Sequence, residues 1–242
     1  MDRMIYLSMS GAKATLQRQD VLSHNLANAT TTGFRAELQA FRAVPVRGDG
    51  ASTRVYSLES TVGYNDLPGA VQATGRDLDV AMKGNAWLAV QGLDGTEAYT
   101  RAGALDVTAE GTLVTQGGLT VMGDGGPLTV PPNSQVSIAP NGTVSAKTPG
   151  QAAVEVGRLK LVTPEGPMTR GDDGLFRAPQ GDLAADDAAR LQDGALEGSN
   201  VSAVETMVAM ISAGRQFEQQ MKLLQTAERQ GTTAAKLLST SG

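Results

Sequence analysis

Cysteine is absent from this sequence of 242 residues, and histidine occurs once. Without cysteine the chain can form no disulfide, no thiol nucleophile and no thiolate metal site. His24 has no second histidine or cysteine with which to build a metal site or a catalytic triad, so a packing or hydrogen-bonding role is favoured for it. We therefore expect no cofactor and no metal.

Basic residues and long apolar runs are also scarce. With 20 Lys and Arg against 25 Asp and Glu, the net charge of −5 argues against a nucleic-acid binder, because neutralising phosphates needs clustered cations. No segment approaches the roughly 18 apolar residues of a membrane span. Residues 1–7 are too short and interrupted for the apolar part of a signal peptide. A cytoplasmic protein and one exported without cleavage both fit.

Aromatic residues make up only 4% of the chain, whereas glycine is frequent, at 29 residues, and gathers in the middle. The core must therefore consist largely of Val, Leu, Ala and Met. From residue 77 to about 162, apolar residues alternate with polar ones and turns recur roughly every 8 to 12 residues, as in an antiparallel sandwich or barrel. Asn141-Gly142, between Ile138 and Val144, predicts a hairpin. The middle of the chain is predicted to be all-β.

A long helix is predicted from Val201 into the last residues of the chain. Ser202 and Glu205 form a capping box at its start. Apolar or small residues then recur at alternating spacings of three and four, which is the pattern of a coiled-coil seam. These residues are Met207, Met210, Gly214, Phe217, Met221 and Leu224. Few charges lie on the other faces, so we expect this helix to contact protein on more than one side.

A second helix is predicted from about Arg3 to Ala27, with Asp2 as its N-cap. Its apolar side carries Ile5, Met9, Ala12, Leu16, Leu22 and Leu26. Because an isolated amphipathic helix is marginal in water, we expect the terminal helices to pair antiparallel, or nearly so, and to offer remaining apolar surface to neighbouring subunits. An intramolecular helical hairpin beside a β domain is the open alternative.

Two connectors complete an α+β fold. Residues 35–76 are predicted as turns with one short strand at 55–58. Residues 171–197 are acidic, but their spacing does not match a calcium-binding EF-hand loop, so a solvated connector is favoured. The predicted domains are thus 1–34 with 195–242 as a helical layer, 35–76 as a connector, and 77–194 as a β domain with an acidic return.

Asp77 and Asp79 form the one carboxylate pair that invites a catalytic interpretation. On a strand, residues two apart share a face, and like charges there would raise one pKa, as in glycosidases. Leu78 and Val80 would then fill the other face, which is the pattern of any half-buried strand. Catalysis is disfavoured, and no small-molecule substrate is expected.

The turn after the first helix carries a recognisable motif. Residues 25–28 (Asn-Leu-Ala-Asn), Thr31 and residues 33–35 (Gly-Phe-Arg) resemble the signature of the bacterial flagellar rod and hook proteins, although His24 stands where that family usually has asparagine. Asn28 and Gly33 tolerate left-handed backbone, which suits a structured turn. Further segments of the chain resemble this family, in the same order as in its members. They are 1–6, 34–46, 74–82, 98–103, 194–201 and 207–227.

The resemblance implies a structural subunit of the flagellar proximal rod, not an enzyme, with helices in an inner layer and the β domain outside. It further implies export without a cleaved signal peptide through the flagellar type III apparatus and assembly in the periplasm. Other proximal-rod subunits and the distal-rod protein are the implied partners, with torque passing through packed helices. The residues expected to carry assembly are Ile5, Met9, Leu16, Leu22, Leu26, Asn28, Gly33, Phe34, Met207, Met210, Phe217, Met221 and Leu224.

Three alternatives stay open at this point. The chain could be the distal-rod member of the same family, a β-rich binding or adhesion module, or a hydrolase that uses carboxylates. A monomer with stable termini would favour the module. Turnover that is lost on Asp77→Asn or Asp79→Asn would favour the hydrolase.

Overall fold

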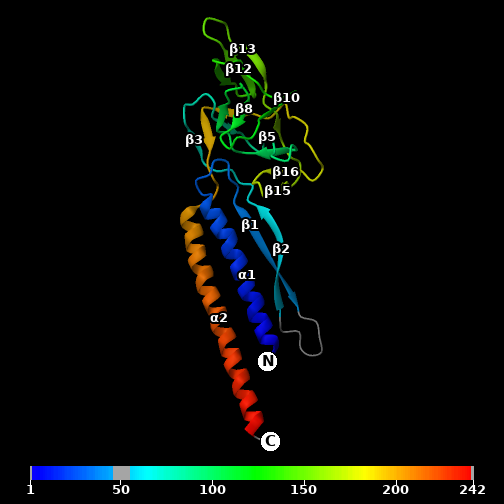
Figure 1. Cartoon of the computed structure of the whole chain (residues 1–242), viewed down its shortest axis with the longest axis vertical. Coiled ribbons are helices and arrows are strands. Elements are labelled where there is room, and N and C mark those ends of the chain that lie inside the picture. The colour runs from blue at the N-terminus through cyan, green and yellow to red at the C-terminus, as the bar shows by residue number, and fades with distance from the viewer. Residues whose placement is uncertain (1, 46–54, 241–242) are drawn as a thin grey trace. The chain divides into compact units, whose positions relative to one another are not determined.

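The computed structural model describes residues 2–45 and 55–240. It has the expected α+β composition, with one long helix near each end and antiparallel strands between them (Figure 1). The chain divides into two compact units. The helical unit takes its residues from Met1–Ala29, Ala36–Asn65 and Val201–Gly242, and the β unit takes them from Thr30–Arg35 and Asp66–Asn200. The three-part division expected from the sequence stays a prediction.

In the helical unit, α1 (Asp2–Ala27) and α2 (Ala203–Thr240) lie side by side and run in opposite directions (Figure 1). The predicted N-cap of α2 is present, because Ser202 Oγ accepts a hydrogen bond from the backbone N of Glu205 at 3.4 Å. Neither helix, over its described residues, contains a stretch apolar enough to cross a bilayer.

The most deeply buried residues of the two helices are small or polar. Ala12 and Thr15 of α1 are buried. A methyl group in place of the Gly11 hydrogen would lie 3.2 Å from the end of the Gln220 side chain, so the Gln220 amide packs directly against the backbone of α1. Buried or half-buried positions of α2 include a series spaced by four and three: Thr206, Met210, Ala213, Phe217, Gln220, Leu224 and Ala227. This series has Met210, Phe217 and Leu224 in common with the predicted seam, and its other members differ from it. Coiled-coil supercoiling of the two helices stays a prediction.

A two-stranded ribbon, β1 (Glu37–Pro45) and β2 (Val55–Tyr64), belongs to the same unit and contacts α1. β2 contains the strand predicted at 55–58 and extends beyond it. β1 was expected to be connector, because its apolar alternation is interrupted. The register shifts between Ala40 and Phe41, and such a bulge moves the following side chains to the opposite face.

The β unit is built of short strands that pair antiparallel. They are β3 (Val71–Ala73), β4 (Val80–Met82), β5 (Trp87–Gln91), β6 (Glu97–Thr100), β7 (Leu105–Val107), β8 (Leu113–Thr115), β9 (Met122–Gly123), β10 (Gly126–Pro127), β11 (Gln135–Ile138), β12 (Thr143–Lys147), β13 (Val154–Arg158), β14 (Leu161–Val162), β15 (Thr169–Arg170), β16 (Phe176–Arg177), β17 (Leu191–Asp193) and β18 (Ala195–Glu197). The largest sheet has the order β14-β5-β6-β16-β15, and a second has β11-β12-β13. The sandwich or barrel arrangement of these strands stays a prediction.

The hairpin predicted at Asn141-Gly142 is confirmed. Ile138 pairs with Val144 across the β11–β12 turn, and Gly142 has a φ of 88°, which favours glycine. After the acidic segment, β17 and β18 bring the chain back to pair with β4 and β3. This return carries Glu197, the last residue of β18, into the interior of the β unit.

The core of the β unit is aliphatic, as the composition predicted. Leu88, Leu105 and Leu113 are completely buried. Trp87, the single tryptophan, is completely buried as well, and the centroid of its ring lies 4.7 Å from that of Phe176. A continuous interior of this kind needs no other protein to cover it.

Candidate assembly surface and buried ion cluster

The first turns of α2 hold a row of large apolar side chains in solvent. Val204, Met207, Val208 and Ile211 are 50–73% exposed. Their spacing of three, four and seven residues places them on one side of the helix. At about 100° per residue, this side is nearly opposite the series that is covered by α1. Contiguous exposed apolar side chains are typical of surfaces that bind another protein, and we call these four residues the outer row.

α1 has a smaller feature of the same kind. Met9 and Leu16 are 59% and 46% exposed and lie seven residues apart, so they share one side of the helix. Met221 and Leu223 add exposed apolar surface further along α2. Both helices thus leave some of their large apolar side chains outside their mutual contact.

The residues expected to carry assembly fall into distinct environments. Exposed ones are Met9, Leu16, Met207 and Met221. Half-buried ones are Leu22, Leu26, Asn28, Met210, Phe217 and Leu224, and buried ones are Gly33 and Phe34. The side chain of Ile5 lies outside the described residues. A role in assembly stays a prediction for all of them, and the exposed group is the one available to a partner.

Val204, Val208 and Ile211 were not among the expected assembly residues. The sequence interpretation followed one seam, and that seam selects a different side of α2. A second apolar series at 204, 207, 208 and 211 has the spacing of a helical face, and this was the signal that could have found them.

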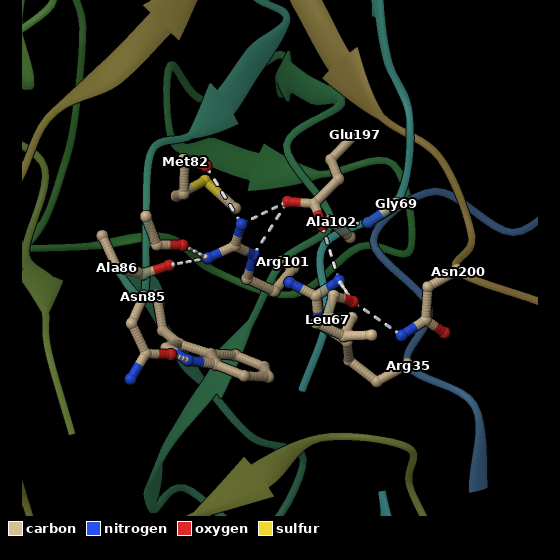
Figure 2. A network of polar contacts seen from close by, with 12 residues as sticks. Arg35, Leu67, Gly69, Met82, Asn85, Ala86, Arg101, Ala102, Glu197 and Asn200 are labelled. Carbon is tan, nitrogen blue, oxygen red and sulfur yellow. Dashed lines mark hydrogen bonds and ion pairs between the residues drawn. The ribbon is translucent and has the colours of Figure 1, made fainter. Parts of the chain in front are cut away.

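A second unusual feature lies inside the β unit, where Glu197 is held between two arginines (Figure 2). Oε1 of Glu197 lies 2.7 Å from Nη1 of Arg35 and accepts a hydrogen bond from the backbone N of Gly69 at 3.0 Å. Oε2 accepts from Nε of Arg101 at 2.9 Å and also contacts Nη2 of that residue. The exposed fraction is 0% for Glu197 and 2% for each arginine. Burial of charge is costly unless it is paired, and here both arginines share Glu197 as their partner, which leaves one positive charge in excess within the trio.

The arginines also bind backbone carbonyls. Arg101 donates to the carbonyl oxygens of Met82, Gly84 and Ala86. Arg35 Nη1 donates to the carbonyl oxygen of Leu67 at 2.8 Å. The guanidinium carbons of Arg35 and Arg101 lie 6.0 and 5.8 Å from the centroid of the Trp87 ring, in the range of a cation–π contact. Burial lowers the pKa of Arg35, and the charge of Glu197 opposes that shift.

Gly33 joins the first-helix motif to this cluster. Its backbone N donates to the carbonyl oxygen of Glu197 at 2.7 Å, and its φ is 69°. A side chain at this position would overlap the carbonyl group of Arg101, so both the conformation and the space require glycine. Asn28 does not use left-handed backbone. Among the described residues, Asn133 is the non-glycine residue that does.

The two aspartates considered for catalysis are not a facing pair. Asp79 is buried and accepts hydrogen bonds from Thr74 Oγ1 at 2.7 Å and from Arg76 Nη1 at 3.3 Å. Asp77 is exposed and accepts from Gln135 Nε2 at 3.2 Å. The side chains serve separate structural contacts, because the segment is a turn that leads into β4 rather than a continuous strand.

The remaining candidates have structural partners too. His24 Nδ1 lies 2.9 Å from Glu37 Oε2, which agrees with the predicted hydrogen-bonding role. In the acidic segment, Asp173 pairs with Arg177 and Asp186 with Thr163. No group of three or more His, Asp or Glu side chains suited to a metal ion occurs in the described part of the chain.

Family models match the chain in three successive segments. Residues 5–35 match the model for flagella basal body rod protein, residues 81–146 the D1 domain of flagellar hook protein FlgE/F/G, and residues 192–237 the C-terminal domain of flagellar basal body rod FlgEFG protein. The first and last segments include the two long helices and both ends of the Arg35–Glu197 ion pair. The class is therefore that of the structural proteins of the flagellar rod and hook.

Full-length relatives narrow the family. The chain is 46% identical to the flagellar basal-body rod protein FlgF of Escherichia coli and 48% identical to that of Salmonella typhimurium, with 100% of both chains covered in each case. It is 29% identical to the rod protein FlgG of Agrobacterium fabrum over 98% of its length and 99% of that relative. The chain belongs to the FlgF family of flagellar basal-body rod proteins, which are structural proteins and not enzymes.

Proposed function

We propose that this chain is a subunit of the proximal rod, and that it joins its neighbours through the exposed sides of its terminal helices. The outer row of α2 is the observation that carries the proposal. Its four large apolar side chains lie on the side of α2 away from α1, in a family whose members are rod proteins. A helix packed on both sides is a natural element of a filament, because contacts that do not close into a ring propagate.

Packing of this kind suits the transmission of torque. Interdigitated side chains between helices resist sliding, since close-packed protein interiors are stiff. Both helices would take part in a coiled-coil layer, α2 through the outer row and α1 through Met9 and Leu16. In the same proposal, residues 1–34 and 195–242 form the inner layer, 35–76 connect it, and 77–194 form a sandwich- or barrel-like outer domain.

Position and partners follow from the family. Identity to the FlgF relatives from Escherichia coli and Salmonella typhimurium exceeds that to the FlgG relative from Agrobacterium fabrum, which favours the proximal-rod role over the distal-rod one. We infer that other proximal-rod subunits and FlgG are the neighbours, and that the rod containing this chain spans the periplasm. Export through the flagellar type III apparatus, without a cleaved signal peptide, belongs to the same inference.

The test is a charge placed in the outer row of the full chain. Ile211→Asp should leave the secondary structure and the unfolding of the β unit unchanged, because Ile211 is 58% exposed. It should reduce incorporation into basal bodies at least about tenfold, since burying an unpaired carboxylate in an apolar interface costs well over 1.4 kcal/mol. Incorporation is measured by quantifying the protein in purified basal bodies, with swimming motility as the second readout.

Gln216→Asp is the matched control. Gln216 is exposed on α2 but lies about 140° further round the helix than Ile211, so the same charge should be tolerated. Phe217 is a less specific probe, because it is half-buried in the series that lies toward α1. Normal incorporation of Ile211→Asp would contradict the proposal, as would an equal loss with Gln216→Asp.

A further inference from the structure

The chain crosses between its two units at four places: 29/30, 35/36, 65/66 and 200/201. The segments of the β unit next to these crossings are Thr30–Arg35 and the two ends of Asp66–Asn200. All of them enter one hydrogen-bonded cluster inside the β unit, and Glu197 lies at its centre (Figure 2). The cluster therefore joins each segment through which the β unit continues into the rest of the chain.

The backbone bonds of the cluster join segments that are far apart in the sequence. Gly33 N donates to the carbonyl oxygen of Glu197 at 2.7 Å, and Asn200 N donates to the carbonyl oxygen of Phe34 at 3.2 Å. Asn200 Nδ2 donates to the carbonyl oxygen of Leu67 at 2.7 Å. That same carbonyl accepts from Arg35 Nη1, so the three segments are bonded pairwise.

The side chain of Glu197 makes these bonds depend on one another. Its two oxygens bind Arg35, Gly69 and Arg101. If β18 left its place, two buried guanidinium groups would lose the carboxylate that they share. A buried charge that loses its partner is strongly destabilising, so the segment that carries Arg35 would have to open too.

We propose that Glu197 is a positioning residue that makes the ends of the β unit open and close as one cooperative element. Three segments are then ordered together or not at all: the turn Thr30–Arg35, the start of the segment after β2, and the end of β18. The inference goes beyond the proposed function and does not rest on it, because it concerns the single chain in solution. It also implies that the β unit is completed only when its last strand has docked.

The experiment is native-state hydrogen exchange of the full chain, followed at the backbone amides of Gly33, Gly69 and Asn200. In the wild-type chain we expect the exchange rates of these three amides to change in the same way as denaturant is added at low concentrations. Amides that belong to one opening unit behave in this way. The amide of Leu113, which donates to the carbonyl oxygen of Leu128 at 2.9 Å in the core, is the internal reference. Unrelated opening behaviour of the three amides would overturn the proposal.

Glu197→Gln removes the charge and keeps the shape of the side chain. It should accelerate exchange at all three amides by about a hundredfold, since the loss of one member of a buried ion pair is strongly destabilising. Glu97→Gln is the matched control, because Glu97 is another carboxylate of the β unit and pairs with Lys160 outside the cluster. It should leave the three amides unchanged. Acceleration confined to Gly69, or equal effects of the two variants, would contradict the inference.

A milder variant covers the case in which Glu197→Gln does not fold. Arg35→Lys keeps the charge, but a lysine ammonium lacks the planar fork that binds a carboxylate and a carbonyl together. It should accelerate Gly33, Gly69 and Asn200 jointly, by about tenfold for a loss of roughly 1.4 kcal/mol. An effect on Gly33 alone would show that the segments open independently, and would overturn the proposal.

Discussion

The two units of this protein use apolar residues in opposite ways. In the β unit a core of aliphatic side chains, such as Leu88 and Leu105, is completely buried, although Leu93 and Val154 are exposed on its surface. In the helical unit the buried positions are mostly small or polar, such as Ala12 and Thr15, while large ones such as Ile211 are exposed. The difference shows which unit is complete by itself. Since burial of apolar area is the main source of stability, the β unit carries its own core, whereas the helical unit leaves part of its apolar surface exposed.

Small residues in the helical contact have a second consequence. Without a large side chain at Gly11, the backbone of α1 comes close to the Gln220 side chain of α2. The helix pair α1 and α2 is therefore narrow, and the outer sides of the two helices are its main surfaces. A contact that filled the space between the helices with Met207 or Ile211 would have removed those residues from any interface with a neighbour.

The largest expected effect tests whether the β unit depends on its own core. Leu105→Ala should lower the free energy of unfolding of the β unit by about 2–5 kcal/mol, because Leu105 is fully buried and truncation leaves a cavity. Denaturant unfolding followed by the fluorescence of Trp87, the single tryptophan, measures this directly. Ile211→Ala in the outer row is the comparison, and it should change the same transition by less than about 0.5 kcal/mol. Similar losses in both variants would remove the contrast between the units.

An intermediate effect is expected from a polar group of the β unit. Burial raises the pKa of Tyr99, and the neighbouring Glu97 raises it further, while the hydrogen bond from the backbone N of Leu183 acts in the opposite direction. Tyrosine in an unfolded chain ionises near pH 10. The contribution of Tyr99 to stability is therefore fully present below about pH 10 and is lost as the pH rises further, because the unfolded chain releases its proton first.

Tyr99→Phe should cost about 1–3 kcal/mol at neutral pH, since it leaves the Leu183 amide without this acceptor. The difference in unfolding free energy between the wild-type chain and the variant should shrink above pH 10. Denaturant titrations at several pH values between 7 and about 11 measure both quantities. A difference that stays constant over this range would show that the folded and unfolded states bind the Tyr99 proton equally.

The smallest effect concerns a polar contact of the helical unit. His24→Ala should change the thermal stability of the helices, followed by circular dichroism, by less than about 1 kcal/mol. The reason is that the contact of His24 with Glu37, although 2.9 Å long, involves a side chain that is 45% exposed. The double variant with Glu37→Ala isolates the coupling between the two residues. A coupling above about 2 kcal/mol would mean that this unit, too, depends on an internal polar contact.

Local features were predictable from the sequence because neighbours in the chain decide them. The cap at Ser202 and the turn at Asn141-Gly142 each depend on a few adjacent residues, and both are present. The bulge in β1 was not predicted, since a single added residue shifts the alternation and hides the strand. The side of α2 that faces α1 was also not predictable. Two overlapping series of residues fit helical spacing there, and hydrophobicity selects Met207 although the contact uses Thr206.

By itself, the sequence determined the composition of the molecule: two helices, a β-rich middle poor in aromatic residues and, without cysteine, no thiol chemistry. The tertiary structure alone decided that Arg35, Arg101 and Glu197 meet in a buried cluster. Charged residues are mostly exposed in proteins, and nothing within a few residues of any of the three indicates burial. Their burial depends on the return of the chain through β18, which is a pairing between segments more than a hundred residues apart.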